Sequence, residues 1–575
     1  MYLLHLTTFA AAVIAIPVVK DEFAEGFPPH VLQLKIGDPP KLCNGTRLAV
    51  KKTMESLIKA TILRGHFEGP NHWYSLAKMD LEKAERVIRN TNKAKNIIIF
   101  IGDGMGMSTV TAARIYQGQK DGRRGEEGYL HFEKFPHVSL IKTYNVDRQV
   151  PDSGATATAF FSGIKTNFYT LGMNSLAKFN TCNVEIGKKA HVKSVLQWAQ
   201  DSGRDTGFVT TTRITHATPA ALYASTPNRD WESDMDIPES EREKGFCKDI
   251  ARQMIENSPG RNTKIILGGG LGKFRNVGNK TSRLDNKDLI QEWKDDKYQH
   301  GTSYRFIENR DQLSDPTLLD NEYILGLFHS NHIPFELDRN SETTAPTLLE
   351  MTTTAVKFLQ KNNKKGYFLA VEGGRIDHAH HLNLGAKALE ETVALSKTIE
   401  AVTKMVDLEN TLIIVTADHS HGFTVNGYPG RGNNILGLGD TDKYGLPYTT
   451  LLYSTGPGLP SHMHKSPEDP SRPFMNLTGF DTTNKEYLQR SSVYQADSSH
   501  AGEDVPVYAI GPMAHMLHGV HEQSYIAHVM GYAAEMGPYS KQTLAMDNTY
   551  EQSYITDILS YDAIMDPYSK ESLTT

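Results

Sequence analysis

The chain has few cysteines, no excess of basic residues and no long apolar run after its first residues. Its three cysteines allow one disulfide and leave one thiol over, and their spacing does not decide which two pair. The formal net charge is −6 at pH 7, so binding to nucleic acid or to an anionic membrane through a basic surface is not expected. No later stretch reaches the ~18 consecutive apolar residues of a transmembrane helix. The remaining composition, 39% hydrophobic and 22% charged, is that of a folded, soluble protein.

The two ends of the chain bear on the localisation of the protein. The apolar run Leu3–Ile16 is too short to span a bilayer and ends in small residues, which is typical of a secretory signal peptide within residues 1–19. A buried N-terminal segment is the alternative interpretation of this run. The polar C-terminus offers no hydrophobic tail, so a lipid-anchor signal is not expected there. Secretion to the extracellular space agrees with three Asn-x-Ser/Thr sequons, at Asn44, Asn279 and Asn476.

Apolar strand patterns alternate with helical patterns along most of the chain. Five apolar runs lead into Gly, Asp, Glu, Thr or His, at residues 96–104, 206–212, 263–270, 366–374 and 411–420. Helical spacing of apolar residues is found at residues 191–203, 347–362 and 384–406. The alternation predicts an α/β fold, a three-layer sandwich with a large, mostly parallel central sheet flanked by helices. Ligands of such sheets bind beyond the carboxyl ends of the strands, which is where the polar residues lie.

Residues 427–497 interrupt this alternation. They are rich in Gly, Pro, Ser and Asn, which predicts an inserted subdomain rather than a continuation of the sheet. We therefore expect one large domain over residues 20–575 that carries this insertion.

Histidines stand beside acidic residues at several predicted strand ends, and such clusters suggest metal ligands. In VEGGRIDHAHH, Asp377 and His381 are four residues apart and share one face of a helix, and Glu372 ends the preceding strand. In IVTADHSHG, the adjacent Asp418 and His419 can bind one ion only where the chain leaves the strand, because neighbours on a strand face opposite ways. A solvated charged helix and a strand-end pair are the respective alternatives.

Weaker signals come from residues that stand alone in the sequence. Asp103 lies in the glycine-flanked turn of FIGDGMG, where its carboxylate can approach a ligand or serve the turn. His500 is a lone histidine, and His216 and Thr218 follow a threonine-rich strand. The planar guanidinium of Arg229 matches a phosphate or sulfate, although a surface ion pair is the commoner role of a single arginine.

The stretch VPDSGATATAF places Ser153 between an aspartate and a glycine. By itself this serine is a plausible helix N-cap. The chain also offers histidine nitrogens that suit zinc and oxygen groups that suit magnesium. Beside such metals, Ser153 is a candidate nucleophile that loses its proton on metal coordination. Two close metals can clamp the attacking and leaving oxygens of a phosphoryl transfer. The residues thus predict metal-assisted transfer on an anionic ester.

Six motifs between about residues 70 and 540 resemble those of the animal alkaline phosphatases. They are FIGDGMG, DSGATATA, TTTRITHATPAA, VEGGRIDHAHH, TADHSHGFTVNGYPGRG and HAGEDVPVYAIGPMAHMLHGVHEQ. The resemblance implies an enzyme that hydrolyses a broad range of small phosphate monoesters at a site with two zinc ions and one magnesium ion. It implies that Ser153 becomes phosphorylated and that Arg229 holds the phosphate.

The resemblance also implies a role for the other residues of the site. The ligands of one zinc are Asp377, His381 and His500. The ligands of the second zinc are Asp103, Asp418 and His419. Magnesium shares Asp103 and is completed by Thr218 and Glu372. Next to these ligands lie His216, Asp152 and His378.

Further implications concern assembly and the periphery. The insertion at 427–497 matches the family's crown subdomain at a homodimer interface, where Tyr428 would reach toward the partner's active site. The family's disulfide implies that Cys182 pairs with Cys247 and leaves Cys43 unmatched. Acidic calcium ligands of vertebrate members are replaced by His329 and Ala345, so calcium is not expected to bind there. Many animal members end in a hydrophobic lipid-anchor signal, and its absence predicts a secreted enzyme.

Two other functions compete with this one. A phosphodiesterase or a sulfatase of the same superfamily would share the metal-bearing strand ends, but the former usually has threonine as nucleophile and the latter a modified Cys or Ser in a C/S-x-P-x-R pattern. A glycoprotein retained only for binding would be expected to have lost a ligand or the serine, and every such position is intact.

Overall fold

A computed structural model describes residues 31–35, 48–54, 57–62, 71–244, 247–278, 281–361, 364–463 and 474–541. The predicted signal peptide, Cys43, Asn44 and Asn279 lie outside the described residues. The chain divides into two compact units, residues 1–88 and 89–575. The first unit contains an antiparallel sheet and a helix: β1 (Val31–Lys35), β2 (Leu48–Met54), β3 (Leu57–Ile62) and α1 (Asn71–Glu85).

The second unit is built on a ten-stranded sheet with the strand order β20-β5-β19-β11-β4-β10-β6-β7-β9-β8. Every pairing in this sheet is parallel except the two that β19 makes, with β11 and with β5. The strands are β4 (Asn96–Gly102), β5 (His137–Lys142), β6 (Asp205–Arg213), β7 (Ile265–Gly269), β8 (Tyr304–Ile307), β9 (Tyr323–Leu327), β10 (Tyr367–Gly373), β11 (Thr411–Ala417), β19 (Val505–Ile510) and β20 (Gly519–Glu522).

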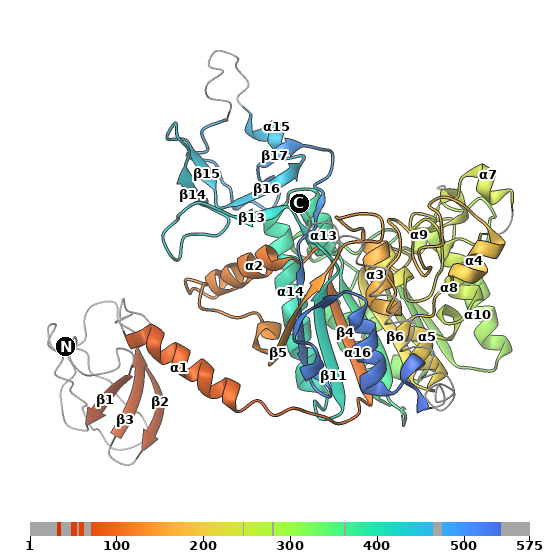
Figure 1. Ribbon diagram of the computed structural model, residues 1–575, viewed down its shortest axis with the longest axis horizontal. Helices are drawn as coiled ribbons and strands as arrows, with labels where there is room; N and C mark the ends of the chain where they lie inside the picture. The colour runs from red at the N-terminus through yellow and green to blue at the C-terminus, as the bar shows by residue number, and fades with distance from the viewer. Residues whose placement is uncertain are drawn as a thin grey trace, which may run out of the picture. The chain divides into compact units, whose positions relative to one another are not determined.

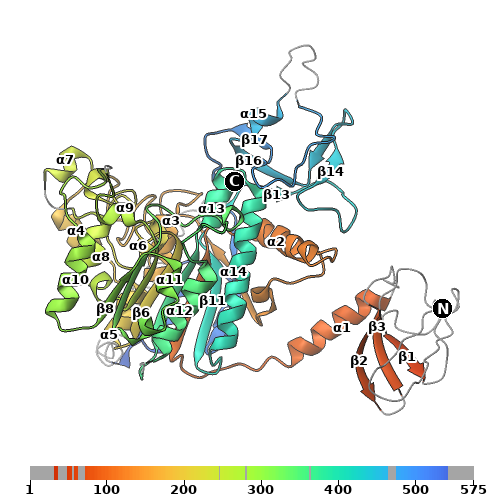
Figure 2. The same ribbon diagram turned by 180° about the vertical axis from the view of Figure 1, so that it is seen from behind.

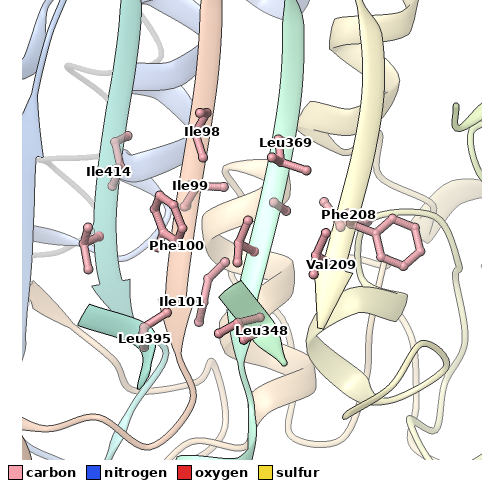
Figure 3. Packing of buried hydrophobic residues seen from close by; sticks show 14 of the residues in the cluster. Ile98, Ile99, Phe100, Ile101, Phe208, Val209, Leu348, Leu369, Leu395 and Ile414 are labelled. Carbon is pink, nitrogen blue, oxygen red and sulfur yellow. The ribbon is translucent and has the colours of Figure 1, made fainter. Parts of the chain in front are cut away.

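The middle strands of this sheet are buried on both faces. The sequence of β4, NIIIFIG, is rich in branched apolar side chains, which suit a strand covered on both sides. Figure 3 shows Ile98 to Ile101 of β4 between Ile414 of β11 and Leu369 of β10, with Leu348 and Leu395 of neighbouring helices nearby. This apolar body fixes the strands, so the residues that follow their carboxyl ends have defined positions.

Helices cover both faces of the sheet, which confirms the predicted three-layer α/β fold. α12 and α14 pack together on one face, and α3, α5 and α16 pack on the other, as the two opposite views of Figures 1 and 2 show. The helices of this unit are α2 (Met107–Lys120), α3 (Ser153–Ser162), α4 (Val184–Ala190), α5 (Val195–Asp201), α6 (Ala217–Ala220), α7 (Glu239–Arg242), α8 (Ile250–Glu256), α9 (Leu271–Phe274), α10 (Leu289–Gln299), α11 (Arg310–Leu313), α12 (Leu348–Lys361), α13 (Arg375–His381), α14 (Gly385–Met405), α15 (Leu459–His462) and α16 (Tyr525–Ala534).

The predicted insertion adds no strand to the central sheet within its described residues, 427–463 and 474–497. It contributes to small sheets formed by β13 (Phe423–Val425), β14 (Leu438–Thr441), β15 (Pro447–Thr449), β16 (Leu451–Gly456) and β17 (Ser491–Tyr494). A further two-stranded ladder pairs β12 (Ser420–His421) with β18 (His500–Ala501). The hydroxyl of Tyr453 on β16 lies 2.7 Å from Nδ1 of His380 on α13, so the insertion is tied to that helix.

One disulfide joins Cys182 to Cys247, with 5.9 Å between their Cα atoms. This confirms the pairing that the family resemblance implies. The bond closes a sequence separation of 65 residues beside α4 and α8.

Candidate active site

Three neighbouring parallel strands deliver acidic side chains to one edge of the sheet. β4 ends one residue before Asp103, β11 ends one residue before Asp418, and Glu372 is the penultimate residue of β10. The register pairs Gly102 of β4 with Ala417 of β11 and with Gly373 of β10, so Asp103 and Asp418 lie at the same level and Glu372 lies two positions before them. Parallel strands that end in register thus bring together residues that are more than 300 positions apart in sequence.

The first group of donors combines α13 with β18. His381 and Asp377 are one helical turn apart, with His381 Nε2 3.2 Å from Asp377 Oδ2, as the four-residue spacing predicts. His500 Nε2 lies 3.5 Å from Asp377 Oδ1 and 3.2 Å from His381 Nε2. The lone histidine of the sequence therefore joins this pair.

Backbone carbonyls fix the orientation of both rings in this group. His381 Nδ1 donates to the Ser498 carbonyl at 2.6 Å, and His500 Nδ1 donates to the Pro151 carbonyl at 2.8 Å. A carbonyl only accepts, so in the neutral rings the lone pairs of the two Nε2 atoms face each other. The two Nε2 atoms, 3.2 Å apart, therefore share one positive charge between them, either a proton or a metal ion. Burial lowers the pKa of His381, but the Asp377 carboxylate outweighs it and raises that pKa to about 9, so a proton takes this place when no metal is bound.

The second group lies where β4 and β11 end. His419 Nε2 is 3.2 Å from Asp418 Oδ2 and 3.6 Å from Asp103 Oδ1. Asp418 Oδ1 accepts the Gly104 backbone N–H at 3.0 Å, whereas neither oxygen of the fully buried Asp103 has a hydrogen-bond partner. The chain leaves β11 at Ala417, which lets Asp418 and His419 face the same point as predicted.

The third group shares Asp103 and adds Glu372 and His216. Glu372 Oε2 accepts from the hydroxyls of Thr210 and Thr212, while Oε1 is buried without a partner. The predicted ligand Thr218, on α6, is buried beside Glu372. His216, expected only next to the ligands, has a donor atom within 4.8 Å of carboxylate oxygens of Asp103 and Glu372.

The buried carboxylates disfavour their own ionisation. Burial, followed by the charges of Asp418, Asp377 and Glu372, holds the pKa of Asp103 well above its usual range. Burial raises the pKa of Asp418 to about 6 and that of Glu372 to about 7. Burial acts in the same direction on Asp377, but His381 and His421 outweigh it and hold that pKa well below the usual range.

The donor sets fit divalent cations. The unpartnered buried oxygens of Asp103 and Glu372 and the two Nε2 atoms that face each other favour the binding of positive charge. Histidine nitrogen mixed with carboxylate in the first two groups suits zinc, and the oxygen-rich third group suits magnesium.

Ser153 lies against the second group. Its hydroxyl oxygen is 3.1 Å from His419 Nε2, and it is the first residue of α3. The interpretation of Ser153 as an N-cap is wrong, because the preceding Asp152 is the cap and its carboxylate accepts the Gly154 N–H at 2.8 Å. The serine side chain is thereby free of a capping role and lines a cavity of about 460 Å³.

Arg229 lines the same cavity. Its guanidinium is 3.4 Å from an Asp152 oxygen and 3.1 Å from His216 Nε2, and its side chain is only 12% exposed. An ion pair was one of the two alternatives for this residue, and the pair exists, but at a buried site rather than on the surface. Because Asp152 caps α3 while it orients Arg229, one carboxylate positions both the serine and the arginine.

Some residues of the site were given no role from the sequence. His421, present in the motif TADHSHG, donates from Nε2 to Asp377 Oδ1 at 2.5 Å. His332, 4.2 Å from the predicted His378 between ring centroids, carried no signal because no motif surrounds it. The amide of the buried Gln523 donates to the Asp418 carbonyl at 2.6 Å, and only its place in the last family-like motif pointed to it.

A family model described as alkaline phosphatase matches residues 94–536. The chain belongs to the alkaline phosphatase family. The tissue-nonspecific isozyme of Homo sapiens is 45% identical over 487 residues, which are 81% of this chain and 89% of the relative. Alkaline phosphatase 4 of Drosophila melanogaster is 42% identical over 501 residues, 82% of each chain. The family that the six motifs indicated is confirmed, and with it a phosphoric monoester hydrolase.

Two solved bacterial alkaline phosphatases share the fold. The enzyme of Thermus thermophilus aligns with a TM-score of 0.54 at 23% identity and covers 82% of this chain and 94% of its own. That of the Antarctic bacterium TAB5 aligns with a TM-score of 0.52 at 24% identity and covers 77% and 99%. Identities this low support the fold alone. Among the described residues, no helix of this alkaline phosphatase is long and apolar enough to cross a membrane.

Proposed function

We propose that this alkaline phosphatase hydrolyses a broad range of phosphate monoesters through a phosphoserine at Ser153, at a site for two zinc ions and one magnesium ion. The observation that carries the proposal is the position of the Ser153 hydroxyl. It lies 3.1 Å from a ligand-type nitrogen of His419 and opens to the cavity that Arg229 lines. Nucleophile, anion-binding group and metal donors therefore meet at one point.

The residues of the chain divide the work as follows. The Ser153 oxygen attacks phosphorus and the bond to the leaving oxygen breaks, which leaves a phosphoserine that water then hydrolyses to free phosphate. The guanidinium of Arg229 donates to the non-bridging oxygens, and Asp152 holds it in that orientation. When bound, the metal ions would lower the pKa of the serine hydroxyl and of the attacking water and stabilise the leaving oxygen.

The ligands follow from the three donor groups. One zinc would be held by Asp377, His381 and His500, and the other by Asp103, Asp418 and His419. Magnesium would be held by Asp103, Glu372 and Thr218, with His216 close by. His378 and His421 contact residues of this set and would orient it. Calcium is not part of the proposal, since His329 and Ala345 offer no carboxylate.

We also propose a secreted homodimer. Tyr428 is 96% exposed on the insertion, and other large side chains of the same insertion, Phe480, Val493 and Tyr494, are more than half exposed as well. A second copy of the chain would cover them. Asn476, the one sequon asparagine among the described residues, is exposed, which supports glycosylation there.

The test combines metal analysis with activity on protein collected from the medium of expressing cells. We expect bound zinc and magnesium, turnover of p-nitrophenyl phosphate that increases toward alkaline pH, loss of activity with a chelator and recovery on adding both metals. Ser153→Ala should lower kcat by about 10³-fold or more while zinc content is unchanged.

Three results would contradict the proposal. They are a chelator-resistant activity with an acidic optimum, a Ser153→Ala variant as fast as the parent, and turnover of bis(p-nitrophenyl) phosphate or p-nitrophenyl sulfate that equals or exceeds turnover of the monoester. The last result would favour the phosphodiesterase or sulfatase alternative.

A further inference from the structure

The catalytic cavity is larger than the phosphate it has to hold, and one part of its wall belongs to none of the catalytic groups. The cavity measures about 460 Å³, within the range of pockets that enclose a whole small molecule. Besides Ser153 and Arg229, its lining residues include Arg148, Phe168 and Tyr169. The part of a substrate beyond the phosphate is therefore expected to contact this wall.

Tyr169 has a backbone conformation that a tyrosine rarely adopts. Its φ is +64°, in the left-handed region that favours glycine. The conformation serves the catalytic groups, because the Tyr169 N–H donates to Asp152 Oδ1 at 2.7 Å and its carbonyl accepts the Arg229 N–H at 2.8 Å. A glycine could make both bonds without strain, so the backbone does not explain why the side chain is a phenol.

The side chain of Tyr169 extends an aromatic surface into the cavity. Its ring lies 4.6 Å from that of Phe168 and 5.8 Å edge-on to that of Phe179, measured between centroids. No described hydrogen bond ties its hydroxyl. The guanidinium carbon of Arg229 lies 5.6 Å from the centroid of the same ring. The ring is thus held by neighbouring rings, by the arginine and by the backbone, which makes it a rigid aromatic contact surface.

Arg148 places a cation on the same wall. Its guanidinium carbon lies 5.8 Å from the Phe168 ring centroid, and its guanidinium donates to the neighbouring Asp147 carbonyl at 3.1 Å. No carboxylate in the described part of the chain forms an ion pair with it. In this it differs from Arg229, whose charge is balanced by Asp152.

We propose that Arg148, Phe168 and Tyr169 form a leaving-group subsite. It favours phosphate monoesters whose leaving group has a planar aromatic ring and carries a second negative charge. The ring stacks on Phe168 and Tyr169, and the second anion pairs with Arg148 at the mouth of the cavity. The inference rests on the proposed monoesterase function and adds a substrate class to it.

Three substrates separate the two contacts. Cyclohexyl phosphate lacks the aromatic ring, phenyl phosphate has it, and 4-carboxyphenyl phosphate adds one negative charge. Each pair is mixed in one tube, and the product ratio gives the ratio of kcat/KM values directly. Because the intrinsic reactivity of each ester is the same for every enzyme, a change of the ratio between parent and variant reports contacts with the protein alone.

Tyr169→Gly tests the ring. We expect the phenyl-to-cyclohexyl preference to fall about three- to tenfold, the size of an aromatic pair contact. The melting temperature should change little, since relief of the left-handed backbone offsets the lost ring contacts. Tyr169→Phe is the matched control and should keep the preference. An unchanged preference in Tyr169→Gly, or an equal loss of rate on all three substrates, overturns the role of the ring.

Arg148→Gln tests the charge. The preference for 4-carboxyphenyl over phenyl phosphate should fall about two- to fivefold at low salt, and the parent should lose the same preference at about 1 M salt, where the Debye length is ~3 Å. Arg123→Gln, a change at an exposed arginine outside the cavity, should leave the ratio unchanged. A ratio that Arg148→Gln does not alter overturns the anionic subsite.

The same assays distinguish a failure of the proposed monoesterase function from a failure of the subsite. If the parent turns over none of the three monoesters, including cyclohexyl phosphate, the monoesterase function is wrong and the subsite falls with it. If the parent hydrolyses all three and the variants keep every ratio, only the subsite is wrong.

Discussion

Two buried clusters of charged side chains in the second unit differ in how their charges are balanced. In one, the fully buried Arg283 donates to both oxygens of Asp249, at 3.1 and 2.9 Å, and to both oxygens of Asp285, at 3.0 and 2.8 Å. In the other, at the ends of β4, β10 and β11, Asp103 and Glu372 leave three buried oxygens without any partner. The first cluster is balanced by side chains of the chain itself, whereas the buried carboxylates of the second fit added cations.

Cavity size does not mark the active site of this alkaline phosphatase. A cavity of about 810 Å³ beside Arg213 and Lys273 is larger than the catalytic one, but its charges are paired, Lys273 with Asp236 at 2.7 Å and Arg213 with Glu232 at 2.5 Å. The catalytic cavity is about 460 Å³ and borders the uncompensated carboxylates. Buried polar groups without partners, rather than volume, distinguish a site that awaits a ligand.

The same chemical change in the two clusters should have opposite effects, and the larger is expected at the catalytic one. Asp418→Asn removes a metal-type ligand and one of several crowded charges. Activity should fall about 10³-fold or more, equivalent to ~4 kcal/mol in the barrier. The metal-free variant should be at least as stable as the metal-free parent, because like-charge repulsion is relieved. Zinc titration, kcat/KM and chemical denaturation after chelation measure the three quantities.

Asp249→Asn is the matched change in the complete cluster. Asparagine still caps α8, but the charge that balances Arg283 is lost. Unfolding free energy should fall by about 3–5 kcal/mol, as for other broken buried pairs, while zinc content and kcat of the folded fraction stay unchanged. Urea denaturation and active-site titration separate these outcomes. A variant that loses zinc before it loses stability would show that the two clusters are not independent.

Of the two charged clusters, local sequence patterns predicted the catalytic one well. The apolar runs located β4, β10 and β11, and parallel pairing then requires Asp103, Glu372 and Asp418 to share an edge. The four-residue spacing placed Asp377 against His381 because both lie on one helix. These inferences need only the periods of strands and helices.

Contacts between distant segments could not be predicted from pattern. The Nδ1 atom of His500 bonds to the carbonyl of Pro151, 349 positions away, and no local signal announces such a contact. The sequence also did not decide which residue caps α3. The helix begins at Ser153, so the cap is Asp152, one residue earlier than the serine. The Arg283 cluster was not foreseen either, since one arginine and scattered aspartates have no characteristic spacing.

The pH dependence of stability should distinguish metal-free from metal-loaded enzyme. Burial raises the folded-state pKa of Asp418 from 3.8 to about 6 and that of Glu372 from 4.5 to about 7. A raised carboxyl pKa means that the folded state binds the proton more tightly, so the metal-free enzyme should lose stability as pH rises from about 4 to about 7. Each of the two groups should contribute about 3 kcal/mol to this loss, since one pKa unit corresponds to ~1.4 kcal/mol.

Metal ions would replace these protons in the loaded enzyme, so its stability should not decline over the same range. Denaturation midpoints at pH 5 and pH 7.5, with and without chelator, test the difference. Equal pH profiles for the two forms would show that the carboxylates are not uncompensated in the folded chain. Asp249→Asn should lower the stability of both forms by a similar amount, because the Asp249–Arg283 pair lies outside the three donor groups.

The smallest effect is expected at Gln523, which contacts the catalytic cluster without being a ligand. Its amide donates to the Asp418 carbonyl at 2.6 Å, and this bond fixes the backbone just before His419. Gln523→Leu should weaken zinc binding about tenfold, as for other residues that orient metal ligands, with a stability loss of ~1–2 kcal/mol. Gln523→Glu places a carboxylate against the Asp418 carbonyl, where neither group can donate a hydrogen bond. This variant should weaken zinc binding more than Gln523→Leu does. Competition with a zinc chelator gives the affinity, and an unchanged affinity in both variants would mean that β11 alone positions Asp418.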